Sequence, residues 1–290
     1  MLVLVREVGF EPTKAYANRD SILEEFAKFC RVDLRLNEKT VSDHVRVIKK
    51  MLLSVKIDPC QITKGDIRDY LAKNSDRDPT VYKNILSGIK RFFRDFMGET
   101  HLVEGFKFPR RPIKFKPISS KEELKKFYAA LERSRDKAMF LLFATSGLRR
   151  NEVLSLSIGD IDFKNRMIKP GNDQSGTKHT WISFFNEEAE NILRGYLANR
   201  KDLDPRLFPL APKTTNTIFK RVARRNGISV TPQGLRKWFC SQMGELGVPD
   251  RYIDAFCGRV PQSILARHYT DYGSERLKQI YDKAGLKVLN

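Results

Sequence analysis

At 290 residues the chain can form one large domain or two ordinary ones, each with its own core, and we expect two. Its 41% hydrophobic content excludes wholesale disorder, and no apolar run approaches the length that crosses a bilayer, so no membrane association is expected. Lys and Arg total 54 against 35 Asp and Glu, a formal charge of +19 that favours a polyanionic partner. Nucleic acid is preferred over an anionic membrane because no amphipathic anchor or lipidation motif is evident.

Residues 1–18 have no clear periodicity and contain a glycine and a proline, so they predict a loosely packed N-terminal arm. Residues 19–104 then predict a bundle of four short helices, because apolar residues recur there at helical spacing. The expected starts of these helices are Asp20 or Ser21, Thr40, Thr63 and the residue after Pro79. The fourth helix is expected to run to Gly98.

Basic side chains decorate the fourth helix and the segment that follows it. On the helix, the candidates for contact with nucleic acid are Lys83, Lys90, Arg91 and Arg94. A solvated face is the alternative. Residues 105–118 contain three prolines, five basic residues and no acidic ones, which predicts an extended linker between two domains. Its charge suggests that it crosses a phosphate backbone. The linker candidates are Arg110, Arg111 and Lys114.

Residues 119–290 predict a larger, α-rich domain. A capping sequence at Ser119–Glu123 starts its first helix. Arg135–Ser146 is unusually apolar, so we expect this helix at the centre of the second core, ending at a glycine. Arg149 then lies at a turn beside the core. Glu152 follows three residues later on the same helical face, where its carboxylate can orient the guanidinium.

Two segments of this domain alternate as strands and predict a small antiparallel sheet. They are Asp160–Lys169 and Thr177–Phe184, with a turn at 171–173 between them. Lys178 lies near this connection, where its ammonium can swing into a cleft; a lysine that only aids solubility is the alternative. Further helices are expected at Glu187–Arg200, Thr214–Asn226, Gln233–Leu246, Asp250–Phe256 and Ser274–Ala284.

Among the residues of 231–272, we single out two arginines and one tyrosine, the groups that phosphoryl transfer without a metal requires. Arg236 and Arg259 can each donate two parallel hydrogen bonds to phosphate oxygens and keep their charge at any physiological pH. Tyr269 supplies a phenol that can attack phosphorus and later leave. Each residue alone also fits a solvated arginine or a core tyrosine, so the order of residues along the whole chain decides between the two interpretations.

The cysteines and histidines indicate no metal site. Four cysteines lack CxxC spacing and four histidines do not cluster with them, so neither a zinc site nor a disulfide framework is expected. The first residues lack a basic region and a cleavage site, which predicts an intracellular protein.

The residue series resembles the tyrosine recombinases, or phage integrase family, over residues 20–290. SGLRRNEVLSL at 146–156 is similar to the first arginine box of the family, QGLR at 233–236 to its second box, and CGR at 257–259 to its Leu-Gly-His triplet. Gln233 stands where histidine is usual, and Arg259 stands where histidine or tryptophan is usual. Tyr269 follows Arg259 by ten residues, one more than the commonest interval.

The subtype is indicated by HYTDY at 268–272, which is similar to integrases of archaeal spindle-shaped viruses and related plasmids. The resemblance implies a mainly α fold with a small antiparallel sheet, in which 19–104 form a helical DNA-binding domain and 119–290 form the catalytic domain. It also implies a partner, a double-stranded DNA attachment site, and a tetramer on two duplexes. A monomer is the expectation without DNA, and a cytoplasmic, nucleoid-associated location follows.

The resemblance implies a reaction in which Tyr269 attacks a phosphodiester, forming a 3′-phosphotyrosine, and the freed 5′-hydroxyl then attacks a partner duplex. No cofactor is expected, since the covalent intermediate conserves the bond energy. Three arginines, Arg149, Arg236 and Arg259, would bind the nonbridging oxygens. Lys178 would protonate the leaving oxygen and Gln233 would position the phosphate.

Several alternatives stay open. Tyr272 can also be the nucleophile, and a type IB topoisomerase or an inactive DNA-binding protein would share part of the pattern. The tail helix from Ser274 can dock on a neighbour or on its own domain. Gly9–Pro12, GFEP, is what the T-arm of a transfer RNA gene would encode in this frame, which suggests an attachment site within such a gene.

Overall fold

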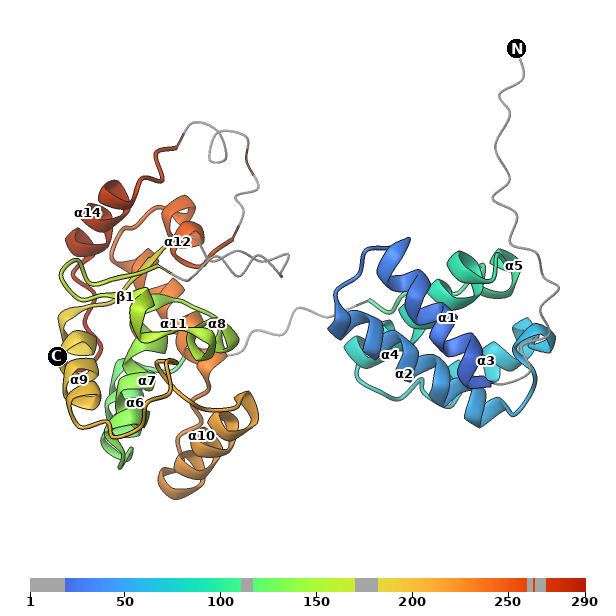
Figure 1. Cartoon of the computed structure of the whole chain (residues 1–290), viewed down its shortest axis with the longest axis horizontal. Helices are drawn as coiled ribbons and strands as arrows, with labels where there is room; N and C mark the ends of the chain where they lie inside the picture. Colours follow the sequence, from blue (N-terminus) through green and yellow to red (C-terminus); the bar gives the residue numbers. More distant parts are fainter. Residues whose placement is uncertain (1–18, 111–116, 170–181, 260–262, 264–269) are drawn as a thin grey trace, which may run out of the picture. The chain divides into compact units, whose positions relative to one another are not determined.

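A computed structural model describes residues 19–110, 117–169, 182–259, 263 and 270–290 (Figure 1). The chain divides into two compact units, Met1–Phe115 and Lys116–Asn290. Each unit has its own cluster of buried hydrophobic side chains. The chain therefore builds two separate cores, and each unit is described by itself.

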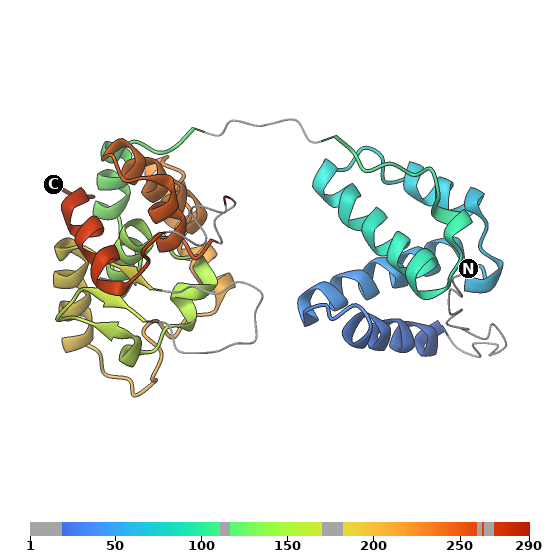
Figure 2. The ribbon, with the colours of Figure 1, turned by 90° about the horizontal axis from the view of Figure 1, so that it is seen from above.

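The first unit is a helical bundle (Figure 2). Its helices are α1 (Arg19–Val32), α2 (Glu38–Val55), the 3-10 turn Pro59–Gln61, α3 (Lys64–Ala72), α4 (Pro79–Lys90), the π-helix Arg91–Phe96 and α5 (Thr100–Val103). Thr63 caps α3 as predicted, in a reciprocal capping box with Asp66. The expected start of α2 at Thr40 was wrong, because the side chain of Asn37 accepts the amide of Thr40 and starts the helix at Glu38.

The predicted fourth helix is interrupted. It ends as an α-helix at Lys90, continues as the π-helix Arg91–Phe96, and the short α5 that follows was not predicted. The wider turn accompanies a tight aromatic cluster: the ring of Phe92 lies 5.2 Å from that of Phe26 and 5.0 Å from that of Phe93. Phe92 and Phe93 are fully buried, so packing of consecutive aromatic residues outweighs regular α-helical geometry here.

The second unit packs its helices around α7. Its elements are α6 (Lys121–Ala129), α7 (Ser134–Ser146), α8 (Arg150–Ser155), the 3-10 turn Ile158–Asp160, β1 (Ile161–Asp162), β2 (Met167–Ile168), β3 (Ser183–Phe184), α9 (Glu187–Ala198), α10 (Pro212–Asn226), α11 (Pro232–Glu245), α12 (Asp250–Phe256) and α14 (Ser274–Ala284). Helix α7 packs against both α9 and α11. Every residue from Ala138 to Ala144 is fully buried, which confirms the prediction that this apolar helix is central.

The sheet is small and antiparallel, in the order β1-β2-β3. The prediction of one strand over Asp160–Lys169 was wrong, because this segment folds into a hairpin in which Ile161 pairs with Ile168. The carboxylate of Asp162 accepts the backbone amide of Asn165 at 3.1 Å, which closes the turn. Strand β3 lies within the second predicted strand, whereas 177–181 and the predicted turn at 171–173 lie outside the described residues.

The tail packs on its own domain. Helix α14 lies at the edge of the second unit in Figure 1, and the hydroxyl of its Tyr281 donates to the carbonyl of Thr145 on α7 at 2.7 Å. The carboxylate of Glu188 accepts the backbone amides of Val288, Leu289 and Asn290. Of the two alternatives for the tail, the structure has docking within the chain.

The mainly α architecture with a small antiparallel sheet is confirmed. None of the helices in the described ranges is long and apolar enough to cross a membrane.

Candidate active site

Arg236 is the buried centre of the candidate site. It lies in the first turns of α11, which starts where Thr231 accepts the amide of Gly234 at 3.0 Å. Its side chain is only 3% exposed. Nη1 donates to the carbonyl of Gly147 at 2.6 Å, and Nη2 donates to the carbonyl of Cys257 at 2.8 Å. One guanidinium therefore ties the end of α7 to the end of α12.

The turn at Gly147 brings the second arginine to the first. Gly147 has φ +65°, and a Cβ atom there would lie 2.6 Å from the ring of Phe239, so only glycine fits this turn. Arg149 follows as the N-cap residue of α8. The carboxylate of Glu152 accepts both the backbone amide and the guanidinium of Arg149, each at 2.6 Å.

Glu152 also reaches the buried arginine. Its Oε2 lies 3.7 Å from Nη1 of Arg236, so one carboxylate lies between two guanidinium groups. The predicted local pairing of Arg149 with Glu152 is present. One carboxylate holds both arginines close together and neutralises only part of their combined positive charge.

Arg259 completes the group from a third segment. It follows Gly258, whose φ is +58°, and Nη1 donates to the carboxylate of Asp254 at 3.1 Å. Its Nη2 lies 3.8 Å from Sγ of Cys240 on α11. The side chain is 46% exposed, so its guanidinium is accessible to a ligand in a way that Arg236 is not.

Arg236 is buried and lies within the electrostatic influence of both other arginines. Burial lowers its pKa, and the charges of Arg149 and Arg259 lower it further. Guanidinium groups stay protonated through such a shift, so the result is a concentrated positive field. The structure thus brings together Arg149, Glu152, Arg236 and Arg259, which the sequence spreads over three motifs.

Of the remaining predicted catalytic residues, Gln233 lies in the described part of the chain and two others do not. Gln233 is exposed, one turn before Arg236 on α11. Lys178 and Tyr269 lie outside the described residues. Tyr272 is 9% exposed, and its ring packs edge-on against Tyr252 with centroids 6.2 Å apart. Tyr272, the alternative nucleophile, is therefore a core residue in this structure.

The basic residues predicted in the first unit do not share one environment. Lys83 and Lys90 lie over the ring of Phe108, at 5.9 Å and 5.2 Å from its centroid. Arg94 is paired with Asp95 at 2.6 Å. Of the other predicted DNA contacts, Arg91 is half-buried and Arg110 is exposed. Arg111 and Lys114 lie outside the described residues.

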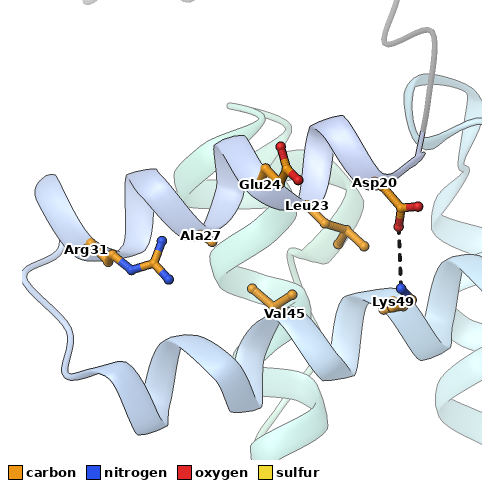
Figure 3. Close-up of a pocket in the computed structure, with 7 residues that line it drawn as sticks. All are labelled: Asp20, Leu23, Glu24, Ala27, Arg31, Val45 and Lys49. Carbon is orange, nitrogen blue, oxygen red and sulfur yellow. Dashed lines mark hydrogen bonds and ion pairs between the residues drawn. The ribbon is translucent and has the colours of Figure 1, made fainter.

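A groove of about 470 Å³ between α1 and α2 is separate from all of these residues (Figure 3). Asp20 and Lys49 form an ion pair of 3.4 Å at one end of it. The lining mixes both signs of charge and includes Glu24 and Arg31, so it has no bias toward an anion. In the part of the chain that the structure describes, no cluster of three or more His, Cys, Asp or Glu side chains is arranged to hold a metal ion.

Comparison with known proteins decides the family. The model of the phage integrase family matches residues 119–276, which contain all three arginine motifs. The chain belongs to the phage integrase family. It is 30% identical over 277 residues to the tyrosine recombinase XerA of Pyrococcus horikoshii, covering 91% of this chain and 94% of the relative. It is 22% identical to the tyrosine recombinase XerD of Listeria monocytogenes, covering 90% and 97% of the two chains. This integrase is a tyrosine recombinase.

Solved structures agree on the fold of the recombinase. A lambda integrase (75–356) dimer bound to a COC′ core site matches with a TM-score of 0.65 at 18% identity, covering 92% of this chain and 96% of that one. A lambda integrase tetramer bound to a Holliday junction matches with a TM-score of 0.63 at 17% identity, covering 87% and 77%. At such identities the likeness establishes the fold alone.

Two features of the recombinase escaped prediction. Helix α10 carries five exposed basic residues and no acidic one, and its composition alone would have revealed it as a candidate DNA contact. The basic residues are Lys213, Lys220, Arg221, Arg224 and Arg225.

The thiols of Cys240 and Cys257 lie 3.4 Å apart, although the sequence suggested no role for the cysteines. A separation of 17 residues carries no signal of that contact.

Proposed function

We propose that this recombinase cleaves and rejoins DNA strands at a specific site through a 3′-phosphotyrosine formed by Tyr269. The observation that carries the proposal is the position of Glu152 between Arg149 and Arg236, with Arg259 beside them. Two guanidinium groups that share one carboxylate, with a third next to them, match the charge and the hydrogen-bonding needs of one phosphodiester. Their preorganisation favours the transition state, in which charge on the nonbridging oxygens increases.

In the proposed first step, Tyr269 gives its phenolic proton to solvent and the phenolate oxygen attacks phosphorus. The bond to the 5′ oxygen breaks, and Lys178 gives that oxygen a proton. The free 5′-hydroxyl then attacks the phosphotyrosine linkage of a partner duplex and releases the phenol. Gln233, exposed at the start of α11, donates a hydrogen bond to the phosphate. A neutral amide cannot titrate, so its role is positioning.

The DNA contacts extend beyond the cleaved phosphate. In the first unit, Lys83 and Lys90 hold their charges over the exposed ring of Phe108, which can pack on a sugar. In the second unit, Arg150 donates to Asn216 of α10 at 3.0 Å. Because Arg150 follows Arg149 in the chain, this bond places α10 next to the segment that carries the first catalytic arginine. We assign its five basic residues to phosphate contacts, which would make affinity fall steeply with salt.

The biological role that fits is integration or excision of a mobile element, with a tetramer acting on two duplexes. The sequence HYTDY at 268–272 supports the subtype of archaeal viral and plasmid integrases. The codons of Gly9–Pro12 test the attachment site: GGN TTC GAA CCN would place it in a transfer RNA gene. Any other codons would exclude that site.

The central experiment uses a plasmid library of genomic fragments from the source organism. The full chain is incubated with the library and denatured with detergent, and DNA bound to protein is recovered and sequenced. Recombinase activity predicts one enriched site, plasmid multimers that depend on it, and an adduct carried by Tyr269. Relaxed plasmid without multimers would instead indicate a topoisomerase.

Matched variants assign the nucleophile. Tyr269→Phe removes one oxygen and should abolish the adduct, whereas Tyr272→Phe should retain it because Tyr272 packs in the core. An adduct that survives in Tyr269→Phe and disappears in Tyr272→Phe would reassign the nucleophile. Survival in both variants would overturn the phosphotyrosine mechanism.

A further inference from the structure

The thiols of Cys240 and Cys257 lie close together, next to Arg236 and Arg259. Cys240 lies one turn after Arg236 on α11, and Cys257 follows the last residue of α12. Their sulfur atoms are 3.4 Å apart, whereas a disulfide requires about 2.05 Å, so closing the bond needs a movement of only about 1.4 Å. Both cysteines are free in the structure.

The two thiols differ in accessibility and charge. Cys240 is half-buried, whereas Cys257 is fully buried. A hydrogen bond from the thiol of Cys257 lowers the pKa of Cys240 to about 6, and the nearby Arg259 and Arg236 add to this effect. The same hydrogen bond and its burial raise the pKa of Cys257. Cys240 is therefore the thiolate that an oxidant meets first.

Both cysteines touch the arginine group. Sγ of Cys240 lies 3.8 Å from Nη2 of Arg259, and the carbonyl of Cys257 accepts from Nη2 of Arg236 at 2.8 Å. Cys257 is followed by Gly258 and Arg259, so a movement of Cys257 is passed directly to the third arginine. A change at this pair reaches two of the three cations.

We propose that Cys240 and Cys257 form an oxidation site at which a peroxide makes a disulfide and reversibly inactivates the recombinase. The thiolate of Cys240 attacks one oxygen of hydrogen peroxide, the O–O bond breaks, and hydroxide leaves to become water. The resulting sulfenic acid is attacked by the sulfur of Cys257, which displaces a second water. Two thiols lose two electrons in total, and one peroxide is reduced to two waters.

The disulfide alters the site in two ways. It removes the negative charge that Arg259 contacts, and it pulls the turn of Cys257 toward α11. Helix α11 is anchored by buried Trp238 and Phe239, so the turn moves more than the helix. A displacement of about 1 Å in a catalytic group can reduce the rate about 100-fold, and on that scale we expect a loss of at least about tenfold. A dithiol such as dithiothreitol restores the thiols and the rate.

The test treats the full chain with hydrogen peroxide and follows two readouts. Nonreducing digestion and mass spectrometry should find a peptide that joins Cys240 to Cys257 and separates on reduction. Adduct formation on a plasmid that carries the enriched site should fall at least about tenfold and recover with dithiothreitol. Only the second readout rests on the proposed function. If the chain formed no DNA adduct even when reduced, the proposed function would fail, whereas the joined peptide would still show whether the disulfide forms.

Variants complete the test, each compared with its own reduced form. Cys60→Ser removes an exposed thiol of the first unit and should leave both responses intact. The double variant Cys240→Ser, Cys257→Ser should lose the joined peptide and the response to peroxide. Absence of the joined peptide in the unaltered chain would overturn the proposal. So would inactivation that persists in the double variant, or a disulfide that forms without slowing the reaction.

Discussion

The carboxylate of Glu152 binds Arg149 twice, through the backbone amide and through the guanidinium, each at 2.6 Å. It also lies 3.7 Å from Arg236, which makes it the shared anion of the site. Glu152→Gln keeps the shape of the side chain but removes its charge, so both guanidinium groups lose their common anchor.

We expect Glu152→Gln to slow adduct formation by about 10- to 100-fold, because misplaced donors lose transition-state stabilisation. DNA affinity should change little, since the variant removes no cation. Rates of adduct formation and filter-binding affinities separate the two effects. Glu245→Gln, an exposed glutamate of α11, is the matched control. An equal loss of affinity and rate in Glu152→Gln would show that the residue acts on binding instead.

Arg236 and Arg259 should separate stability from catalysis. In the native protein the guanidinium of Arg236 donates to the carbonyls of both Gly147 and Cys257. The single ammonium of Arg236→Lys cannot reproduce both bonds, so the free energy of unfolding of the second unit should fall by about 1–3 kcal/mol. Arg259→Lys loses an exposed ion pair, worth about 0–1 kcal/mol. Both should reduce adduct formation about 10²- to 10³-fold.

The unfolding transition can be followed by tryptophan fluorescence, because Trp238 is buried on the same helix as Arg236. If Arg259→Lys destabilised the unit as much as Arg236→Lys, the assignment of Arg236 as the structural member of the group would be wrong.

Gly147 should tolerate no side chain. Gly147→Ala adds a methyl group 2.6 Å from the ring of Phe239 at a φ of +65°. We expect a loss of about 2–5 kcal/mol, the sum of backbone strain and overpacking. Gly227→Ala has a similar φ of +72° and open space, so it should lose only about 1–2 kcal/mol. Equal losses in denaturant titrations of the two variants would show that the contact with Phe239 is relieved.

The reactivity of Cys240 should depend on pH in an unusual range. Its folded pKa is lowered to about 6, and the thiolate is the reactive form, so alkylation by iodoacetamide should rise with pH through about 6 and level off near neutrality. In urea the rise should move to about 8.5, the ordinary range of a thiol. Cys60 has a pKa raised by partial burial and the nearby Asp58, and it serves as the internal comparison in mass spectra. If alkylation of Cys240 and Cys60 showed the same pH dependence, the lowered pKa of Cys240 would be wrong.

Helix α10 should contribute to the salt dependence of DNA binding. Replacing Arg221 and Arg224 with alanine should reduce the slope of log affinity against log salt by about 0.9 for each phosphate that the variant no longer neutralises. Lys201→Ala, an exposed lysine of a loop, is the control. An unchanged slope in the double variant would remove α10 from the DNA interface.

The sequence predicted well where local chemistry decides the structure. The cap at Thr63 and the pairing of Glu152 with Arg149 each depend on residues three apart, and the burial of α7 follows from its continuous apolar sequence. Alternation over Asp160–Lys169 was misleading, because the side chain of Asp162 closes a turn inside the apparent strand.

Contacts between distant segments could not be predicted in the same way. Nothing in the sequence around Cys240 indicates that packing of α11 against α12 places it beside Cys257. The contact of Glu152 with Arg236 likewise depends on how α7, α8 and α11 pack. The motifs of the family indicated that the arginines converge, but not which of them would be buried.

The hydrogen bonds from the backbone amides of Val288, Leu289 and Asn290 to Glu188 determine how this end of the chain can be labelled. A reporter fused by replacing Val288–Asn290 would take three donors away from this half-buried carboxylate, which would keep the hydrogen bond from the side-chain amide of Asn186. A fusion partner joined after Asn290 through a flexible spacer keeps these bonds, so labelling strategies for single-molecule work should extend this end and never trim it.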